Sequence, residues 1–315
     1  MQPYTNQGPV NCDIDFDASN IKGKTAVVTG GANGIGEAYV RALVNAGYAS
    51  AFIADLDEEE GRKLEQELGS SVKFVKCNVT VWSDQLAVFK KSLSLSPSGR
   101  IDIVIANAGI AGGDSVYFTD VEAEEPEEPR LNVLGVNLTA VMYTIKLALH
   151  HFRRQNAMKR GEPLDQVLVL QGSLAGYVGL PGAPQYQASK YGRRGVFKSL
   201  RLTEWQHNIR VGYIAPWFIE TKIMSEAVLD HLKNANTQFA TVDDAASALS
   251  RIVADKSIHG RSLAILPRSL APRGYVDLCD DDQEGTLLYK LQEAASKGTH
   301  RSSLSAESQK TSTQW

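Results

Sequence analysis

The sequence predicts a single α/β domain of the doubly wound type, with a seven-stranded parallel sheet and helices on both faces. Two observations lead to this prediction: short apolar runs alternate with longer stretches of helical period, and a glycine-rich turn directly follows the first apolar run. Buried parallel strands are continuous apolar runs, and parallel neighbours need long crossovers that are usually helical. With 315 residues, 43% of them hydrophobic and 22% charged, the chain can bury one such core.

Seven short runs are the predicted strands. They cover residues 25–29, 51–54, 72–77, 101–106, 167–170, 211–214 and 262–266. The clearest helical stretch is 131–154, where apolar side chains recur every three or four residues, and Gly47 is expected to end the first helix. We predict an N-terminal extension over 1–21, the domain over 22–267, and a C-terminal extension over 268–315 that holds a helix and, from about residue 297, a disordered tail.

Charge and cysteine content limit the classes of partner. Lys plus Arg number 33 against 36 Asp plus Glu, so no overall positive field is available to bind nucleic acid. The cysteines Cys12, Cys77 and Cys279 are odd in number and widely spaced, and the six histidines show no metal-ligand spacing. We recognise no secretory signal and no apolar stretch of membrane-spanning length. We therefore expect a cytoplasmic protein that binds no metal, nucleic acid or membrane.

The turn after the first predicted strand reads Thr29-Gly-Gly-Ala-Asn-Gly-Ile-Gly36. It can cradle a pyrophosphate: Gly30 permits a tight turn, Gly34 lets the backbone approach a ligand, Gly36 allows close helix packing, and the helix N-terminus supplies N–H groups. The turn lacks the lysine of a P-loop.

Asp55 ends the second predicted strand, 19 residues after Gly36. A carboxylate there can accept hydrogen bonds from the ribose hydroxyls of adenosine, and it would repel a 2′-phosphate, so the sequence favours NAD over NADP. A second interpretation, in which Asp55 only caps the next helix, stays open.

Tyr186 and Lys190 are four residues apart in a helical stretch, and they therefore share one helix face. A free phenol, with a pKa near 10, is a poor base at neutral pH, and a nearby cation in a partly desolvated site can lower that pKa. The pair is a candidate acid/base unit.

The sequence resembles the short-chain dehydrogenase/reductase family over roughly residues 22–267. The resemblance rests on ordered motifs: the glycine turn, Asn107-Ala108-Gly109 after the fourth strand, Asn137 in the long helix, Ser173 placed 13 residues before Tyr186, Lys190, and the run from Pro216 to Thr221. It implies a Rossmann-type fold and an oxidoreductase acting on CH–OH groups with a dinucleotide cofactor.

The resemblance also implies the role of each matching residue. Tyr186 would be the acid/base, Ser173 would bind the substrate oxygen, Lys190 would bind the nicotinamide ribose and lower the pKa of Tyr186, and Asn137 would hold a relay water through its backbone. The implied dinucleotide-binding residues are Thr29, Gly30, Asn33, Gly34, Ile35, Gly36, Asp55, Asn78, Val79, Asn107, Ala108, Gly109, Tyr186, Lys190, Pro216, Ile219 and Thr221.

Three positions depart from the family pattern. Asn78 stands where the family usually has Asp near the adenine, Ser173 follows Gly172 rather than a second serine, and Trp217 replaces the glycine of the usual Pro-Gly pair. Within the family, the sequence is most similar to the 15-hydroxyprostaglandin dehydrogenase-like and fungal secondary-metabolism members. The glutamine that prostaglandin dehydrogenases carry three residues before the tyrosine is Ala183 here, which argues against prostaglandin itself.

The family places a substrate lid after the sixth strand, here at about residues 217–240, and the lid is rich in large apolar side chains. The predicted substrate pocket consists of Leu174, Tyr177, Ala183, Trp217, Phe218 and Met224. Together these features predict an NAD-dependent dehydrogenase of hydrophobic secondary alcohols and ketones. The resemblance also implies that the protein forms a homodimer or homotetramer.

Two other interpretations stay open. One is a catalytically silent dinucleotide-sensing protein of the same fold. The other is a scaffold that acts through the acidic stretch 120–128, which we otherwise expect to be a solvated loop.

Overall fold

The computed structural model describes residues 1, 4, 8–45, 47, 50–279 and 284–298. Its strands are β1 (Thr25–Thr29), β2 (Ser50–Asp55), β3 (Val72–Lys76), β4 (Ile103–Ala106), β5 (Gln166–Gln171), β6 (Ile209–Pro216), β7 (Arg261–Ile265) and β8 (Tyr275–Asp277). Its α-helices are α1 (Gly34–Asn45), α2 (Glu58–Leu68), α3 (Trp82–Leu95), α4 (Asn132–Leu134), α5 (Ala140–Met158), α6 (Pro184–Arg201), α7 (Glu226–Asn234), α8 (Val242–Ala254) and α9 (Leu287–Gly298). Short 3₁₀ turns are η1 (Ala18–Ile21), η3 (Leu174–Gly176) and η4 (Glu204–His207), and a π-helix, η2 (Gly135–Thr139), joins α4 to α5.

The sheet has the order β3-β2-β1-β4-β5-β6-β7-β8. The first seven strands pair in parallel, as the apolar runs predicted, and β1 and β4 are neighbours at the point where the chain changes winding direction. Ligands of open parallel sheets bind at such a point, outside the carboxyl ends of the strands.

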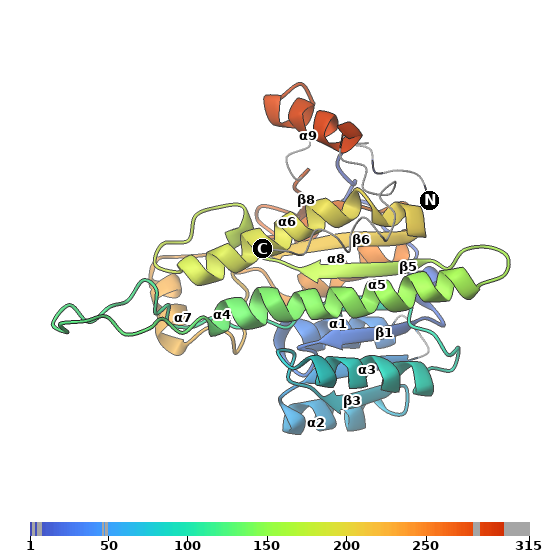
Figure 1. Ribbon diagram of the computed structural model, residues 1–315, viewed down its shortest axis with the longest axis horizontal. Helices are drawn as coiled ribbons and strands as arrows, with labels where there is room; N and C mark the ends of the chain where they lie inside the picture. Colours follow the sequence, from blue (N-terminus) through green and yellow to red (C-terminus); the bar gives the residue numbers. More distant parts are fainter. Residues whose placement is uncertain (2–3, 5–7, 46, 48–49, 280–283, 299–315) are drawn as a thin grey trace, which may run out of the picture.

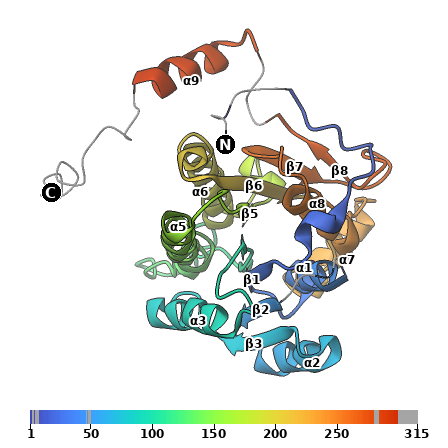
Figure 2. The same ribbon diagram turned by 90° about the vertical axis from the view of Figure 1, so that its right-hand side faces the viewer.

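Helices cover both faces of the sheet, as Figure 2 shows in a view along the strands. Alternate strand residues define the two faces. Val28 and Ile53 pack in the core beneath α1 and α8, whereas Val27 and Phe52 pack in the core beneath α3 and α5. The long helix begins one residue later than predicted and runs on to Met158, and it lies across the sheet (Figure 1). Its apolar side chains pack into the core on that face.

The predicted count of seven strands misses β8, which pairs antiparallel with β7 beyond the predicted domain boundary at residue 267. The N-terminal extension also belongs to this edge. The backbone N–H of Val10 donates to a carboxylate oxygen of Asp277 at 2.8 Å, and Arg261 pairs with the same carboxylate at 2.7 Å. Cys12 and Ile21 are buried in the core. Both extensions therefore contribute to the domain.

The remaining expectations outside the sheet have mixed outcomes. Gly47 adopts a left-handed backbone, with φ of 74°, two residues after α1 ends, and residues 120–128 are exposed, as predicted. The C-terminal extension holds α9, which lies apart from the layered core in Figure 2. Most of the predicted disordered tail, residues 299–315, lies outside the described residues.

Candidate active site

A cavity of about 590 Å³ opens at the carboxyl ends of the central strands. Its lining includes these predicted dinucleotide-binding residues: Gly30, Asn33, Gly34, Ile35, Gly36, Asp55, Val79, Asn107, Ala108, Gly109, Tyr186, Lys190, Pro216, Ile219 and Thr221. The predicted pocket residues Leu174, Ala183, Trp217, Phe218 and Met224 line the same cavity, together with Ser173. One space thus reaches from the glycine turn to the Tyr186 side chain and the lid.

The glycine turn is packed too tightly for side chains. A Cβ on Gly36 would lie 1.9 Å from the carbonyl oxygen of Gly30, and a Cβ on Gly30, whose φ is 63°, would lie 2.8 Å from the Cα of Ala108. Asn107 fixes the turn through its side-chain amide, which donates to the carbonyls of Thr29 and Gly30. The turn, backed by the N-terminus of α1, therefore fits a dinucleotide pyrophosphate.

Asp55 lies at the carboxyl end of β2 and faces the cavity. One of its carboxylate oxygens accepts from the backbone N–H of Ala32 at 3.0 Å, and the other accepts from Asp57 at 3.1 Å. The alternative interpretation, in which Asp55 only caps the next helix, is partly correct: Asp55 accepts a hydrogen bond near the start of α2, but the N-cap residue of α2 is Asp57. A carboxylate has about four lone-pair sites, so Asp55 can also accept from ribose hydroxyls.

Two residues predicted at the dinucleotide do not line the cavity. Asn78 uses its side-chain oxygen to accept from the backbone and hydroxyl of Thr80, which closes a local turn and makes the amide a structural group. Thr29 is buried, and its hydroxyl oxygen accepts from the backbone N–H groups of Asn107 and Ala108. Thr29 therefore supports the cavity wall from behind.

Tyr186, Ser173 and Lys190 meet at the centre of the cavity. Tyr186 and Ser173 both line the cavity, and their hydroxyl groups interact. Lys190 is buried, its ammonium donates to the carbonyl of Gly172 at 3.1 Å, and its nitrogen lies 5.1 Å from the centroid of the Tyr186 ring. The shared helix face predicted from the sequence is therefore confirmed, and it points at Ser173.

The electrostatics of this centre differ from the expectation. Burial raises the pKa of Tyr186 above its ordinary value, although the nearby Ser173 hydroxyl and the positive charge of Arg193 act in the opposite direction. Burial, aided by Arg193, holds the pKa of Lys190 well below its ordinary value. The raised pKa keeps the phenol protonated at neutral pH in this arrangement, and the charge that acts to lower this pKa is that of Arg193.

Asn137 lies behind the cavity wall rather than in its lining. Its side-chain amide donates to the carbonyl of Ile110 and accepts from the N–H of the same residue, both at 2.8 Å. Its backbone carbonyl, predicted to hold a relay water, accepts a hydrogen bond from the guanidinium of Arg193. The Arg193 guanidinium therefore occupies the carbonyl that was expected to hold the relay water, and the sequence motifs did not predict this contact.

Tyr177 was predicted to line the substrate pocket, and this prediction is wrong. Its hydroxyl hydrogen-bonds the Ser262 hydroxyl at 2.6 Å, and the guanidinium carbon of Arg194 lies 3.9 Å from its ring centroid. These contacts turn the ring toward α6 and β7. Its neighbours Val178 and Leu180 line the cavity instead.

Sequence reasoning missed two buried charged residues beside the site. Asp114 accepts from the backbone N–H of Gln185 at 2.6 Å, which fixes the loop after β4 to the start of α6. Arg193 lies seven residues after Tyr186, and this spacing places it on the same helix face. That spacing was a signal from which Arg193 could have been predicted.

Among the residues that the structure describes, no group of three or more His, Cys, Asp or Glu side chains could hold a metal ion.

Comparisons with known proteins agree with this geometry. The family model described as short chain dehydrogenase matches residues 24–231. The chain is 36% identical to 5′-hydroxyaverantin dehydrogenase of Dothistroma septosporum over 87% of this chain and 92% of that protein. It is 33% identical to NADP-dependent dehydrogenase M3 of a Phoma species over 86% of this chain and 84% of that protein. In fold it matches the 3-ketoacyl-(acyl-carrier-protein) reductase of Brucella melitensis solved with NADH, with a TM-score of 0.66, 24% identity, and coverage of 78% of this chain and 97% of that chain.

The ordered motifs, the sheet that gathers them around one cavity, and these matches agree with one another. The chain therefore belongs to the short-chain dehydrogenase family, as an oxidoreductase that acts on CH–OH groups with a nicotinamide dinucleotide.

Proposed function

We propose that the protein is an NAD(H)-dependent dehydrogenase that interconverts a secondary alcohol and a ketone on a hydrophobic small molecule. The observation that supports this most is the single cavity in which the glycine turn and Asp55 share a wall with Tyr186, Ser173 and the apolar lid. A dinucleotide held along the turn would extend toward the reacting centre. When bound, the nicotinamide supplies a hydride donor or acceptor.

In this proposal the chain's own residues handle the proton. Ser173 and Tyr186, which both line the cavity, would both bind the substrate oxygen. In ketone reduction the Tyr186 hydroxyl gives its proton to that oxygen as negative charge develops there, and in alcohol oxidation Tyr186 takes the hydroxyl proton. Lys190, behind the ring, would bind ribose hydroxyls of the dinucleotide.

The choice of NAD(H) rests on Asp55. A 2′-phosphate would meet this carboxylate, and Lys222, the nearby cation of the lid, pairs with Glu60 of α2 at 2.9 Å. The Phoma relative is named NADP-dependent, so both dinucleotides belong in the test.

The substrate class rests on the lid wall. Trp217 and Phe218 form an edge-to-face pair with centroids 4.7 Å apart, and Met224 and Leu174 extend the apolar lining. Such a wall favours a carbocyclic or long-chain substrate over a sugar or a phosphorylated metabolite. Together with the similarity to 5′-hydroxyaverantin dehydrogenase, it favours a role in secondary metabolism.

We also propose a cytoplasmic homodimer or homotetramer without nucleic-acid or membrane partners. Contrary to the expectation from the sequence, the helix Asn132–Met158 is long and apolar enough to span a membrane by length and composition. Its side chains Val141, Ile145 and Phe152 are buried in the core of the sheet, as in the core helix of a globular domain.

Replacing Tyr186 by Phe tests the proposal. We expect turnover of an apolar ketone to fall at least ~100-fold, because the phenol oxygen transfers the proton, whereas NADH affinity stays nearly unchanged. Tyr191→Phe is the matched control, since this exposed tyrosine lies on the same helix outside the cavity, and it should retain activity. A wild-type protein that binds NADH but turns over no alcohol or ketone in a broad panel would favour the dinucleotide-sensing alternative.

A further inference from the structure

Arg193 is a fully buried guanidinium in the wall behind the reacting centre. Its Nη1 donates to the carbonyl of Gln171 at 2.6 Å, its Nη2 donates to the carbonyl of Ala108 at 2.7 Å, and its Nε donates to the carbonyl of Asn137. These carbonyls belong to the end of β5, the loop after β4 and the π-helix η2. One side chain on α6 therefore ties together three elements that line or back the cavity.

The guanidinium carries its charge without a carboxylate in contact, among the residues that the structure describes. Burying a charge is costly, and hydrogen bonds to neutral carbonyls alone repay that cost poorly. Two other buried arginines of this protein have carboxylate partners: Arg210 contacts Asp165 at 2.7 Å, and Arg261 contacts Asp277 at 2.7 Å. At Arg193 no such ion pair within the described part of the chain offsets the cost of burying the charge, so we looked for a functional role of the charge.

The ionisable groups in electrostatic contact with Arg193 are Tyr186 and Lys190 on its own helix and Tyr213 on β6. The Tyr213 hydroxyl donates to the carbonyl of Lys190 at 3.3 Å, and β5 presents the carbonyl and side-chain amide of Gln171, which accepts from Tyr39 of α1. The loop after β4 and η2 present backbone carbonyls and the amide of Asn137. Tyr186 is the group in this set that must lose and regain a proton in the proposed reaction.

We propose that Arg193 is a positioning residue for this reaction, which supplies fixed positive charge behind Tyr186 and holds the Asn137 carbonyl in place of a relay water. The inference rests on the proposed function of Tyr186. A guanidinium suits the role better than an ammonium, because it stays charged at neutral pH and its planar fork can bind carbonyls from several elements at once. Alcohol oxidation, which needs the phenolate of Tyr186, would depend on Arg193 more than ketone reduction does.

The test removes or weakens the positive charge at position 193 and measures the effect on the ionisation of Tyr186. In Arg193→Met we expect the rising limb of log kcat/KM against pH for alcohol oxidation to move up by about one pH unit, because the phenolate loses a neighbouring cation. Arg193→Lys should move it in the same direction by less. A lysine can keep part of the charge, and it serves as the second variant should Arg193→Met fail to fold.

A titration that needs neither substrate nor dinucleotide gives an independent readout. The chain has 11 tyrosines, so the tyrosinate absorbance of each Arg193 variant is compared with that of the same variant carrying Tyr186→Phe. The difference isolates Tyr186. We expect its titration to occur at higher pH in both Arg193 variants than in the wild-type background.

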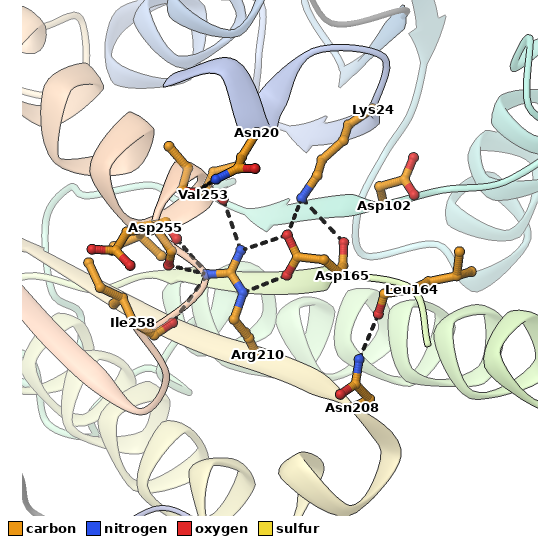
Figure 3. Close-up of polar contacts among 12 residues, drawn as sticks. Asn20, Lys24, Asp102, Leu164, Asp165, Asn208, Arg210, Val253, Asp255 and Ile258 are labelled. Carbon is orange, nitrogen blue, oxygen red and sulfur yellow. Dashed lines mark hydrogen bonds and ion pairs between the residues drawn. The ribbon is translucent and has the colours of Figure 1, made fainter. Parts of the chain in front are cut away.

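Arg210→Lys is the matched control. Arg210 is equally buried and also donates to several backbone carbonyls, but it lies at the opposite ends of the strands (Figure 3). We expect this variant to lose thermal stability while its pH profile and Tyr186 titration stay as in wild type.

The outcomes distinguish the proposed role of Arg193 from the proposed function of the protein. Folded Arg193 variants with a wild-type pH profile and a wild-type Tyr186 titration, whatever their melting temperature, would overturn the role of Arg193 alone. An active Tyr186→Phe protein would overturn the proposed function itself.

Discussion

We propose that the choice of dinucleotide depends on Asp55. Its carboxylate already accepts from Ala32 in the glycine turn and from Asp57 at the start of α2, so its orientation is set before a ribose arrives. Such preorganisation lowers the entropic cost of binding. The same contacts mean that changing Asp55 disturbs the turn as well as the ribose site.

We expect the wild-type protein to have a higher kcat/KM with NAD(H) than with NADP(H), and Asp55→Ser to reduce that preference at least ~10-fold, because the repulsion of a 2′-phosphate is removed. Steady-state kinetics with both dinucleotides measures this. Asp57→Ser is the control: it changes the N-cap of α2, which accepts from Glu60 at 3.1 Å, and should leave the preference unchanged. A wild-type preference for NADP(H) would contradict the assignment.

At the scale of elements, residues 217–240, which we propose as the substrate lid, form a loop whose two ends are joined by a hydrogen bond. The backbone N–H of Ala240 donates to the carbonyl of Phe218 at 2.9 Å, and between these residues α7 presents no fully buried side chain. Ile223 and Val228 are exposed yet line the cavity mouth. A segment with so few buried contacts opens at low free-energy cost, which suits the entry of a bulky apolar ligand.

Trp217→Gly tests the lid wall. We expect the ratio of kcat/KM for a bulky apolar ketone over a small polar ketone to fall about 10-fold, because a large apolar surface is lost from the cavity. Trp205→Gly is a suitable control, since this half-buried tryptophan lies in η4, near the opposite ends of the strands. The idea fails if wild type prefers the polar substrate or if Trp217→Gly leaves the ratio unchanged.

The elements also show which parts of the structure the sequence could predict. The seven parallel strands were found to within two residues at each end, because strands buried on both faces are continuous apolar runs. β8 was missed, since three residues at a sheet edge leave no periodic signal. The glycine turn and the pair of Tyr186 and Lys190 were found through fixed spacings. The spacing of Arg193 from Tyr186 places it on the same helix face, but its burial depends on carbonyls from three distant segments, which the sequence does not show.

At the scale of the whole molecule, the strand ends opposite the cavity are held by a buried ionic network, shown in Figure 3. Arg210 donates to Asp165 and to the carbonyls of Ile252 and Val253, and Lys24 also pairs with Asp165. Burial would raise the pKa of Asp165, but the charges of Arg210 and Lys24 outweigh burial and hold it below its ordinary value.

A carboxyl whose pKa is lower in the folded state stabilises the fold above its unfolded pKa, near 4, and this contribution is lost as pH falls through the folded value. Asp165→Asn should therefore lower the free energy of unfolding by about 3 kcal/mol at pH 7. That difference should shrink toward pH 3, as measured by urea unfolding across this range. Glu125→Gln, in the exposed acidic loop, should change little at any pH. A pH-independent difference would exclude the ionised carboxylate as its cause.

The outer faces of α5 and α6 carry the exposed apolar side chains Met142 and Tyr191. We expect these helices to pair with those of a second copy as a four-helix interface, giving a dimer or tetramer by light scattering at micromolar concentration. The double variant Met142→Glu with Tyr191→Glu should dissociate it. A monomeric wild-type protein would refute this prediction.

The contact between Val10 and Asp277 has a consequence for synthesis of the chain. It joins residues 267 positions apart, and Asp277 also anchors Arg261 of β7. During translation the segment around Val10 leaves the ribosome early, but its partner strand is made only after the entire parallel sheet has been synthesised. The segment around Val10 must therefore wait without this partner while the central strands assemble, and docking of this edge is one of the last steps of folding.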